Sequence, residues 1–368
     1  MNELILKQEE KAMLALRSLY KSYGFKPYKM NKFEEYDYYL RNKDFLISDR
    51  VITFNDTDGR LLALKPDVTL SIVKNSDHNV GTKQKVYYNE NVYRVSDSTQ
   101  CYKEIMQTGL ECIGDIDIYD LYETILLAAK SLSLISDRYV LEISHLGILS
   151  SLLKQASDDE KFQKEASKYI AKKNTHDLRR LCEMYEISDE HANRLCSLLS
   201  VYGERESVLK ALESICSSQE TLQALSTLRC LSEMLSLTPH ASNIRFDFSI
   251  VNDMNYYNGI VFQGFLDGIC ESVLFGGQYD HLMERLGKKD RAIGFAIYLD
   301  MLEQLYVEQE KYDVDILLLY DDNSSPIQLA KKANELINAG YSISIQKKID
   351  PDTRYREIMN FEMGDSSC

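Results

Sequence analysis

The sequence predicts an α+β protein with an antiparallel sheet core, flanking helices, a helical insertion and a short C-terminal α/β unit. Three observations lead to this prediction. Segments in which apolar and polar residues alternate, as in half-buried strands, occupy the first third of the chain and the stretch that begins at residue 243. Between them, residues 145–239 carry leucines at helical spacing. After residue 312, an apolar run, a helical pattern and a second strand indicate a βαβ unit.

Local patterns predict the elements of the first third. Residues 3–22 have apolar positions at helical spacing and end at Gly24, so we expect a helix there. Strands are expected at 45–55 and 61–65, on either side of a turn. Pro66 and the acidic and hydroxyl residues after it predict a helix start. The next elements are expected to be two strands, a helix and a strand, at 85–95, 104–113, 117–135 and 139–144.

The rest of the chain is divided in the same way. Strands are expected at 244–250, 257–266 and 269–275, where Gly276-Gly277 breaks the run, and helices at 280–286 and 292–304. The βαβ unit comprises a strand at 313–320, a helix at 326–338 and a strand at 341–346. We therefore expect a core of residues 1–145 and 243–308, a helical insertion of 146–242 and a C-terminal unit of 312–368.

Composition narrows the class of function. The 368 residues include 43 basic and 57 acidic side chains, and a net charge of −14 opposes nucleic-acid binding, which depends on displacing counterions from phosphates. No apolar stretch is long enough to span a membrane, and there is no signal-peptide pattern, so we expect a cytoplasmic protein. The eight cysteines are scattered without C-x-x-C pairs, which favours reduced thiols. We expect no metal and no cofactor.

One predicted strand carries polar residues that suit a binding site. In the strand at 104–113, Gln107, Gly109 and Glu111 share a face, because alternate residues of a strand point the same way. A carboxylate and an amide on either side of a glycine can hold an ammonium group. The solvent-facing side of an amphipathic strand would show the same pattern.

Two further segments offer polar groups. Asp67 and Thr69 supply a carboxylate and a hydroxyl at a predicted helix start, where they are also ordinary capping residues. Arg94 ends a predicted strand and can pair with a ligand carboxylate, or form a surface ion pair.

Three tyrosines accompany a predicted hairpin. Tyr256 and Tyr257 lie in segment 254–262, and Tyr279 lies in segment 275–280. Tyrosine hydroxyls can fix the polar edge of a ligand. Because the chain has 25 tyrosines, a packing role is the alternative for each.

Taken in order, these motifs resemble the class II aminoacyl-tRNA synthetase core of the histidyl type, over about residues 5–145 and 243–305. Segment 64–69 is similar to L-R-P-E-G-T, 92–94 to the F-R of the second class motif, 107–111 to Q-x-G-x-E, 255–258 to L-D-Y-Y, 275–280 to G-G-R-Y-D, and 294–296 to the start of the third class motif. The resemblance implies a histidine site lined by Asp67, Thr69, Arg94, Gln107, Glu111, Tyr256, Tyr257 and Tyr279.

The chain departs from this pattern where the synthetase reaction uses cations. Met301 stands where the family has an arginine that grips ATP phosphates, and Asn252 replaces the arginine before the tyrosine pair. Ser96 replaces an acid of the second motif, and Asn31 replaces the proline of the first, at the dimer contact. Fixed cations stabilise the charge that develops in adenylation, so we expect no catalysis by this chain.

A histidine site without these cations resembles the regulatory subunit of ATP phosphoribosyltransferase, a synthetase paralogue. This resemblance implies a subunit of histidine biosynthesis that activates a short catalytic subunit and mediates feedback inhibition by L-histidine, as a homodimer within a hetero-oligomer. Two alternatives are a degenerate synthetase-like enzyme that activates histidine with ATP, and a nucleic-acid-binding sensor, which the net charge of −14 disfavours.

Overall fold

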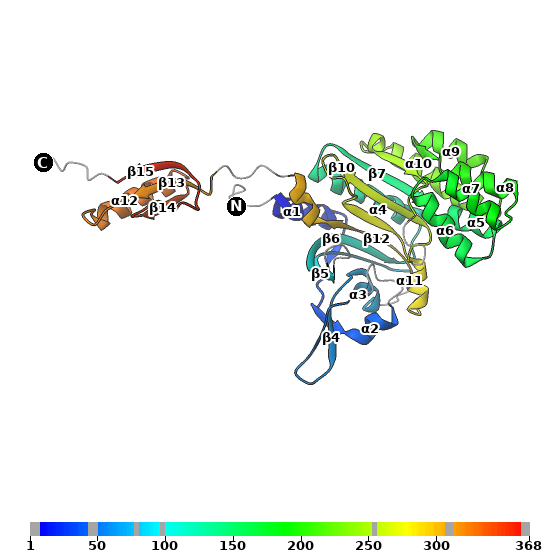
Figure 1. Cartoon of the computed structure of the whole chain (residues 1–368), viewed down its shortest axis with the longest axis horizontal. Coiled ribbons are helices and arrows are strands. Elements are labelled where there is room, and N and C mark those ends of the chain that lie inside the picture. The colour runs from blue at the N-terminus through cyan, green and yellow to red at the C-terminus, as the bar shows by residue number, and fades with distance from the viewer. Residues whose placement is uncertain are drawn as a thin grey trace. The chain divides into compact units, whose positions relative to one another are not determined.

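The computed structural model describes residues 8–42, 51–76, 81–95, 100–251, 256–305 and 312–361. The chain forms two compact units, Met1–Leu305 and Tyr306–Cys368 (Figure 1). The first unit contains the large sheet and most of the helices, and the second is the small C-terminal unit. Each is described by itself below.

A sheet of nine strands is the centre of the first unit. Its order is β1 (Lys26–Pro27), β5 (Lys83–Val95), β6 (Tyr102–Gly114), β12 (Arg291–Tyr298), β11 (Leu274–Gln278), β10 (Ile260–Leu266), β7 (Tyr139–His145), β9 (Ile244–Asp247) and β8 (Tyr202–Gly203). The strands from β5 to β7 pair antiparallel, as expected. The β1–β5 and β7–β9 pairs are parallel, so the sheet as a whole is mixed.

The two faces of this sheet carry different layers. On one face α1 (Gln8–Ser22) and α4 (Ile118–Ile135) build the main core, to which Leu110 and Cys112 of β6 belong. On the other face a second apolar cluster includes Leu70 of α3 (Thr69–Lys74), Leu282 of α11 (Asp280–Arg285) and Ile113 of β6. Side chains of β6 thus alternate between the layers, and Glu111 points to the second face.

The predicted helical stretch is helical. It comprises α5 (Leu146–Ala156), α6 (Glu160–Ala171), α7 (Thr175–Met184), α8 (Asp189–Leu198), α9 (Arg205–Glu213) and α10 (Gln219–Ser236), which lie together beside the sheet (Figure 1). Buried residues of these helices, such as Leu152, Leu181 and Leu228, belong to the same hydrophobic core as those of α4 and the sheet. The helical stretch therefore shares one core with the strands on either side of it in the chain.

Two smaller sheets complete the fold. One has the order β2–β4–β3, with strands Phe33–Glu35, Leu61–Leu64 and Thr53–Asn55, and lies near α2 (Tyr36–Arg41). It accounts for the predicted strands at 61–65 and, in part, 45–55, because residues 43–50 lie outside the described residues. The other forms the C-terminal unit, in which β13 (Val314–Leu319) lies between β14 (Ile343–Gln346) and β15 (Tyr355–Asn360), all parallel, with α12 (Pro326–Asn338) connecting β13 to β14. The βαβ prediction is confirmed, whereas β15 was not predicted.

Two of the predicted elements are wrong. Residues 292–298 form the strand β12, and only Leu299–Leu305 are helical, as a 3-10 segment. Apolar residues buried on both faces of a central strand show no alternation, so periodicity alone cannot distinguish such a strand from a helix. The strand expected at 269–275 is instead β11, which begins at Leu274 and ends at Gln278, so Gly276 and Gly277 lie inside a strand and do not break it. A Cβ on Gly276 would stand 2.5 Å from the Phe262 ring and from Phe295 Cβ, so close packing explains this glycine.

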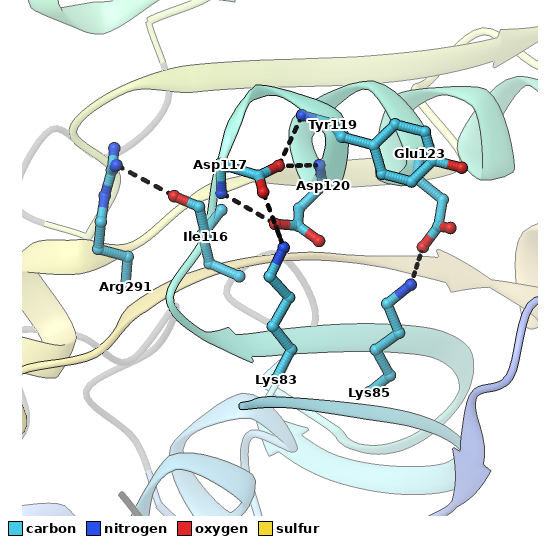
Figure 2. Close-up of polar contacts among 8 residues, drawn as sticks. All are labelled: Lys83, Lys85, Ile116, Asp117, Tyr119, Asp120, Glu123 and Arg291. Carbon is cyan, nitrogen blue, oxygen red and sulfur yellow. Dashed lines mark hydrogen bonds and ion pairs between the residues drawn. The ribbon is translucent and has the colours of Figure 1, made fainter. Parts of the chain in front are cut away.

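Charged pairs hold the start of α4 against the sheet (Figure 2). The Asp117 side chain accepts hydrogen bonds from the backbone N–H groups of Tyr119 and Asp120, and the Asp120 side chain accepts one from the Asp117 N–H. Lys83 of β5 pairs with Asp117 at 3.0 Å and with Asp120 at 2.6 Å, and Lys85 pairs with Glu123. The two carboxylates are favourable at the positive N-terminus of the helix, and Lys83 offsets the repulsion between them.

The close approach at Gly276 makes a testable prediction. We expect Gly276→Ala to lower the free energy of unfolding by about 1–3 kcal/mol, because the added methyl overpacks the contact with Phe262 and Phe295. Urea denaturation of the purified chain measures this. In a double-mutant cycle, Phe262→Leu should relieve part of the loss. Strictly additive effects of the two changes would contradict this account of the glycine.

Candidate functional site

Glu111 of β6 is the centre of the candidate site, on the face of the sheet that α3 and α11 cover. Its side chain is buried, with the residue 2% exposed. One carboxylate oxygen accepts a hydrogen bond from Thr69 Oγ1 at 2.6 Å, and the other accepts one from the Tyr279 hydroxyl at 2.7 Å. Gly294 lies opposite Glu111 in β12, where a Cβ would stand 1.7 Å from Glu111 Oε2. A side chain at 294 would therefore displace the carboxylate.

Asp67 and Thr69 reach the site from the start of α3. The helix begins at Thr69, within the segment 66–69 that was expected to start it. Asp67 precedes the helix and its Oδ1 accepts a hydrogen bond from the Leu70 N–H at 2.8 Å, as a capping residue does. Burial raises the pKa of Asp67, and the Leu70 N–H and the charge of Arg94 act in the opposite direction. The segment 67–69 therefore both caps the helix, through Asp67, and contacts Glu111, through Thr69.

The three tyrosines pack as one group against this carboxylate. The ring centroid of Tyr256 lies 4.6 Å from that of Tyr257 and 5.9 Å from that of Tyr279. Tyr256 and Tyr279 are buried. Burial raises the pKa of the Tyr256 hydroxyl, to which the charges of Asp67 and Glu111 add, while a hydrogen bond with Thr69 lowers it. The predicted hairpin is confirmed, since β10 and β11 pair with Val261 opposite Gly277.

The electrostatics of the site favour a neutral Glu111 when no ligand is present. Burial raises the pKa of Glu111 to about 8, the hydrogen bonds from Thr69 and Tyr279 lower it, and the nearby Asp67 raises it further. A cation placed beside the carboxyl would favour its charged form. The arrangement can therefore take up an ammonium group with loss of a proton from Glu111.

Arg94 and Gln107 have different positions. Arg94 is buried, and its Nε donates a hydrogen bond to the Pro66 carbonyl at 3.0 Å, so that its charge acts on Asp67. Gln107 is buried on β6, with its backbone opposite Tyr298 of β12. The Gln107 side chain makes no hydrogen bond within the described residues. The structure thus connects Asp67, Thr69, Glu111 and the tyrosines by contacts, and Gln107 only by its strand.

Tyr88 of β5 belongs to the same group and was missed. It lies opposite Gly109, where a Cβ would stand 2.6 Å from the Tyr88 hydroxyl oxygen. Burial raises the pKa of Tyr88 well above its ordinary value, and the charges of Glu111 and Asp67 raise it further. Gly109 could have indicated that a large side chain lies opposite it, but only the register of β5 with β6 reveals that this residue is Tyr88.

Among the positions where cations are replaced, Met301 is described. It lies in the 3-10 segment Leu299–Leu305 and packs, partly buried, against the main core. A thioether here contributes packing and no charge. Asn252, which replaces the other arginine, lies outside the described residues. Of the two remaining departures from the family pattern, Ser96 also lies outside them and Asn31 is exposed.

The described residues contain neither a metal-ligand cluster nor a membrane-spanning helix. Within the ranges that the structure describes, no group of three or more His, Cys, Asp or Glu side chains is placed to hold a metal ion. Seven cysteines are free thiols in these ranges, and Cys368 lies beyond them. No helix among the described residues is both long and apolar enough to span a membrane.

The chain is similar to known proteins in both sequence and fold. The family model for histidyl-tRNA synthetase matches residues 4–302. An ATP phosphoribosyltransferase regulatory subunit of Oceanobacillus iheyensis is 29% identical over 314 residues, which is 84% of this chain and 77% of the relative.

Solved structures share the fold. A structure of an ATP phosphoribosyltransferase regulatory subunit/histidyl-tRNA synthetase from Bacillus halodurans has a TM-score of 0.78 at 22% identity, covering 96% of this chain and 93% of that one. A chain of the ATP phosphoribosyl transferase (HisG:HisZ) complex from Thermotoga maritima has a TM-score of 0.63 at 20% identity, covering 79% of this chain and 97% of that one.

The raised pKa of Glu111 predicts a pH dependence of stability. Below its unfolded pKa the carboxyl is protonated in both states, and above about 8 it is charged in both. Between these limits the folded chain holds a proton that the unfolded chain releases, so stability falls as the pH rises, by up to about 1.4 kcal/mol per pH unit. We expect Glu111→Gln to remove this fall, as measured by urea denaturation from pH 5 to pH 8. Equal slopes for the two proteins would contradict the assignment.

Proposed function

The chain belongs to the histidyl-tRNA synthetase family, and on that basis we propose that it is a non-catalytic regulatory subunit of ATP phosphoribosyltransferase in histidine biosynthesis. It activates a short catalytic subunit and confers feedback inhibition by L-histidine. The relative from Oceanobacillus iheyensis and the similarity in fold to a chain of the complex from Thermotoga maritima support this choice of partner.

The observation that carries the proposal is that Glu111 is kept while the arginine expected at position 301 is replaced by methionine. Glu111 remains buried and bonded to Thr69 and Tyr279, as ammonium recognition requires. At position 301, where the family has an arginine for ATP phosphates, a methionine packs on the core. Because adenylation depends on fixed positive charge, removing it costs the reaction more than it costs histidine binding.

In this proposal each polar group of the ligand has a partner. Glu111 receives the α-ammonium of histidine, Arg94 the carboxylate, and Tyr257 with Asp67 the remaining polar edges. Thr69, Tyr256 and Tyr279 hold Glu111 and one another in place, and Gln107 and Tyr88 border the same face of the sheet.

Regulation then follows from a difference in affinity. Histidine can shift the activity of a complex only if it binds one assembly state better than another. We place this binding in a homodimer of the chain within a hetero-oligomer in the cytoplasm, where reduced thiols such as those seen here persist. Nucleic acid is not a proposed partner, since the net charge is −14.

Calorimetric titration with L-histidine, of the chain alone and with the short catalytic subunit, tests the proposal. We expect binding with proton release from Glu111, so that the measured heat differs between phosphate and Tris buffers. Glu111→Gln should weaken binding by about ten- to hundredfold, because it removes a charged partner of the ammonium. In the assembled complex this variant should keep activation and lose histidine inhibition.

A matched control is Glu142→Gln. Glu142 also lies on a strand of the large sheet, and its pKa is also raised by burial, but it has no contact with the site residues among the interactions described. Its variant should keep wild-type inhibition. No heat at millimolar histidine with or without the catalytic subunit would rule out histidine sensing.

The alternative function is activation of histidine with ATP, which the synthetase family name itself favours. Histidine-dependent exchange of pyrophosphate into ATP separates the two functions, because only adenylation supports it. We expect no exchange above a blank without protein, since Met301 supplies no charge. Exchange that is abolished by Glu111→Gln would overturn the regulatory assignment.

A further inference from the structure

A cleft of about 540 Å³ lies between the large sheet and the helical stretch. Its walls are the ends of β7 and β11, the start of β12, the start of α4, one side of α5 from Gly147 to Lys154, the first turns of α10 and the start of α11. This volume is within the range of about 300–1,000 Å³ that is usual for small-molecule sites.

The cleft is separate from the site around Glu111. Gln278 lines the cleft, whereas the next residue, Tyr279, bonds to Glu111. Successive residues at a strand end point to opposite faces, so the two places lie on opposite sides of the sheet. The proposed function leaves this cleft without a role.

The buried side chain of Gln278 and the half-buried ring of His145 offer N–H groups to the cleft. Gln278 is 4% exposed, and its Oε1 accepts a hydrogen bond from the Ile260 N–H at 2.8 Å. Its Nε2 has no acceptor among the described residues. His145 accepts a hydrogen bond from the Gly147 N–H at its Nδ1, at 3.1 Å, which leaves the ring proton on Nε2. Burial lowers the pKa of His145 to about 4, so at neutral pH the ring is uncharged and Nε2 is a donor.

The backbone holds the two donors side by side. His145 pairs with Ile260 across β7 and β10, and Ile260 is the residue that Gln278 binds. Glycines make this arrangement possible. A Cβ at Gly259 would stand 2.1 Å from Gln278 Oε1, and one at Gly147 would stand 2.9 Å from His145 Cε1. His145 is also the N-cap residue of α5, an 11-residue helix whose positive end favours an anion.

The charges around the cleft are partly neutralised by the protein itself. Asp117 pairs with Lys83, and Arg291 donates to the Ile116 carbonyl at 3.2 Å (Figure 2). Arg291 also pairs with Asp280. Lys154 of α5 and Glu220 of α10 also line the cleft, and neither has an ion pair within the described residues. One cation and one anion thus remain to meet a ligand.

We propose that this cleft is a second ligand site, which binds the carboxylate of a free α-amino acid on the N–H groups of Gln278 and His145. The ammonium group of the ligand faces Glu220. A doubly charged phosphate fits less well, because the carboxylates of Glu220, Asp117 and Asp280 line the same cleft and repel it. The proposal goes beyond histidine sensing and does not depend on it.

The test uses the full chain and each proteinogenic amino acid except histidine, with inorganic phosphate and AMP as the phosphate-bearing probes. Ligand-observed NMR screens the compounds, and calorimetry measures the affinity of those that bind. We expect at least one amino acid to bind with a Kd of about 1 mM or lower. Its 2-oxo acid and its decarboxylated amine should both bind more weakly, because each lacks one of the two charged groups.

Two variants test the donors independently. Gln278→Glu keeps an oxygen for the Ile260 N–H and replaces the free amide N–H by a second oxygen. His145→Asn keeps a residue type that caps helices and removes the ring N–H. Each should weaken amino-acid binding by about ten- to hundredfold, the usual effect of losing a hydrogen bond to a charged group. Gln163→Glu on α6 is the matched control and should bind as the wild type does.

Three results would overturn the proposal. They are the absence of amino-acid binding up to about 10 mM, wild-type affinity in both folded donor variants, and binding of phosphate or AMP in place of amino acids. Because histidine is left out and Glu111→Gln should leave this binding intact, failure here is distinct from failure of the histidine site.

Discussion

The pairing of Glu111 with the bare backbone of Gly294 is the constraint on which the site depends. The Glu111 side chain on β6 occupies the space that a side chain at position 294 of the neighbouring strand β12 would need, so it can lie there only because residue 294 is glycine. Once buried, it needs partners, and the start of α3 and the end of β11 each supply one hydroxyl. The position of two distant segments is therefore fixed by the need to satisfy a single group.

The same logic separates binding from catalysis. In the proposed histidine site, the groups that would recognise the amino acid belong to the sheet and its covering helix, where their removal would leave buried polar atoms without partners. The arginine that the synthetase pattern has at position 301 is, in contrast, replaced in this chain by Met301, which lies in a segment after β12 and packs on the core. Met301 contributes packing at its position, whereas loss of Glu111 would disturb its hydrogen bonds with both Thr69 and Tyr279.

Much of this could be predicted from the sequence. The alternation in β6 correctly gave the face of Glu111, and the apolar spacing with Asp117 at its start gave α4. The sequence predicts a helix where β12 lies, because both faces of this strand are buried and apolar and polar residues therefore do not alternate along it. Tyr88 was missed because its place opposite Gly109 depends on strand pairing, a relation between residues distant in the chain. Asp67 showed the cap pattern, but local sequence could not reveal that the cap also stands beside a buried carboxyl.

The hydrophobic core that runs without interruption from α1 through the sheet into α10 has an evolutionary consequence. Leu132 of α4 and Leu228 of α10 belong to one packed interior, so the helical stretch is not a detachable module. A replacement by a segment of different shape would expose to water the faces of α4 and β10 that the helical stretch covers. We therefore expect this stretch to change during descent by compensated substitutions on both sides of the packing, and not by exchange of whole segments between lineages.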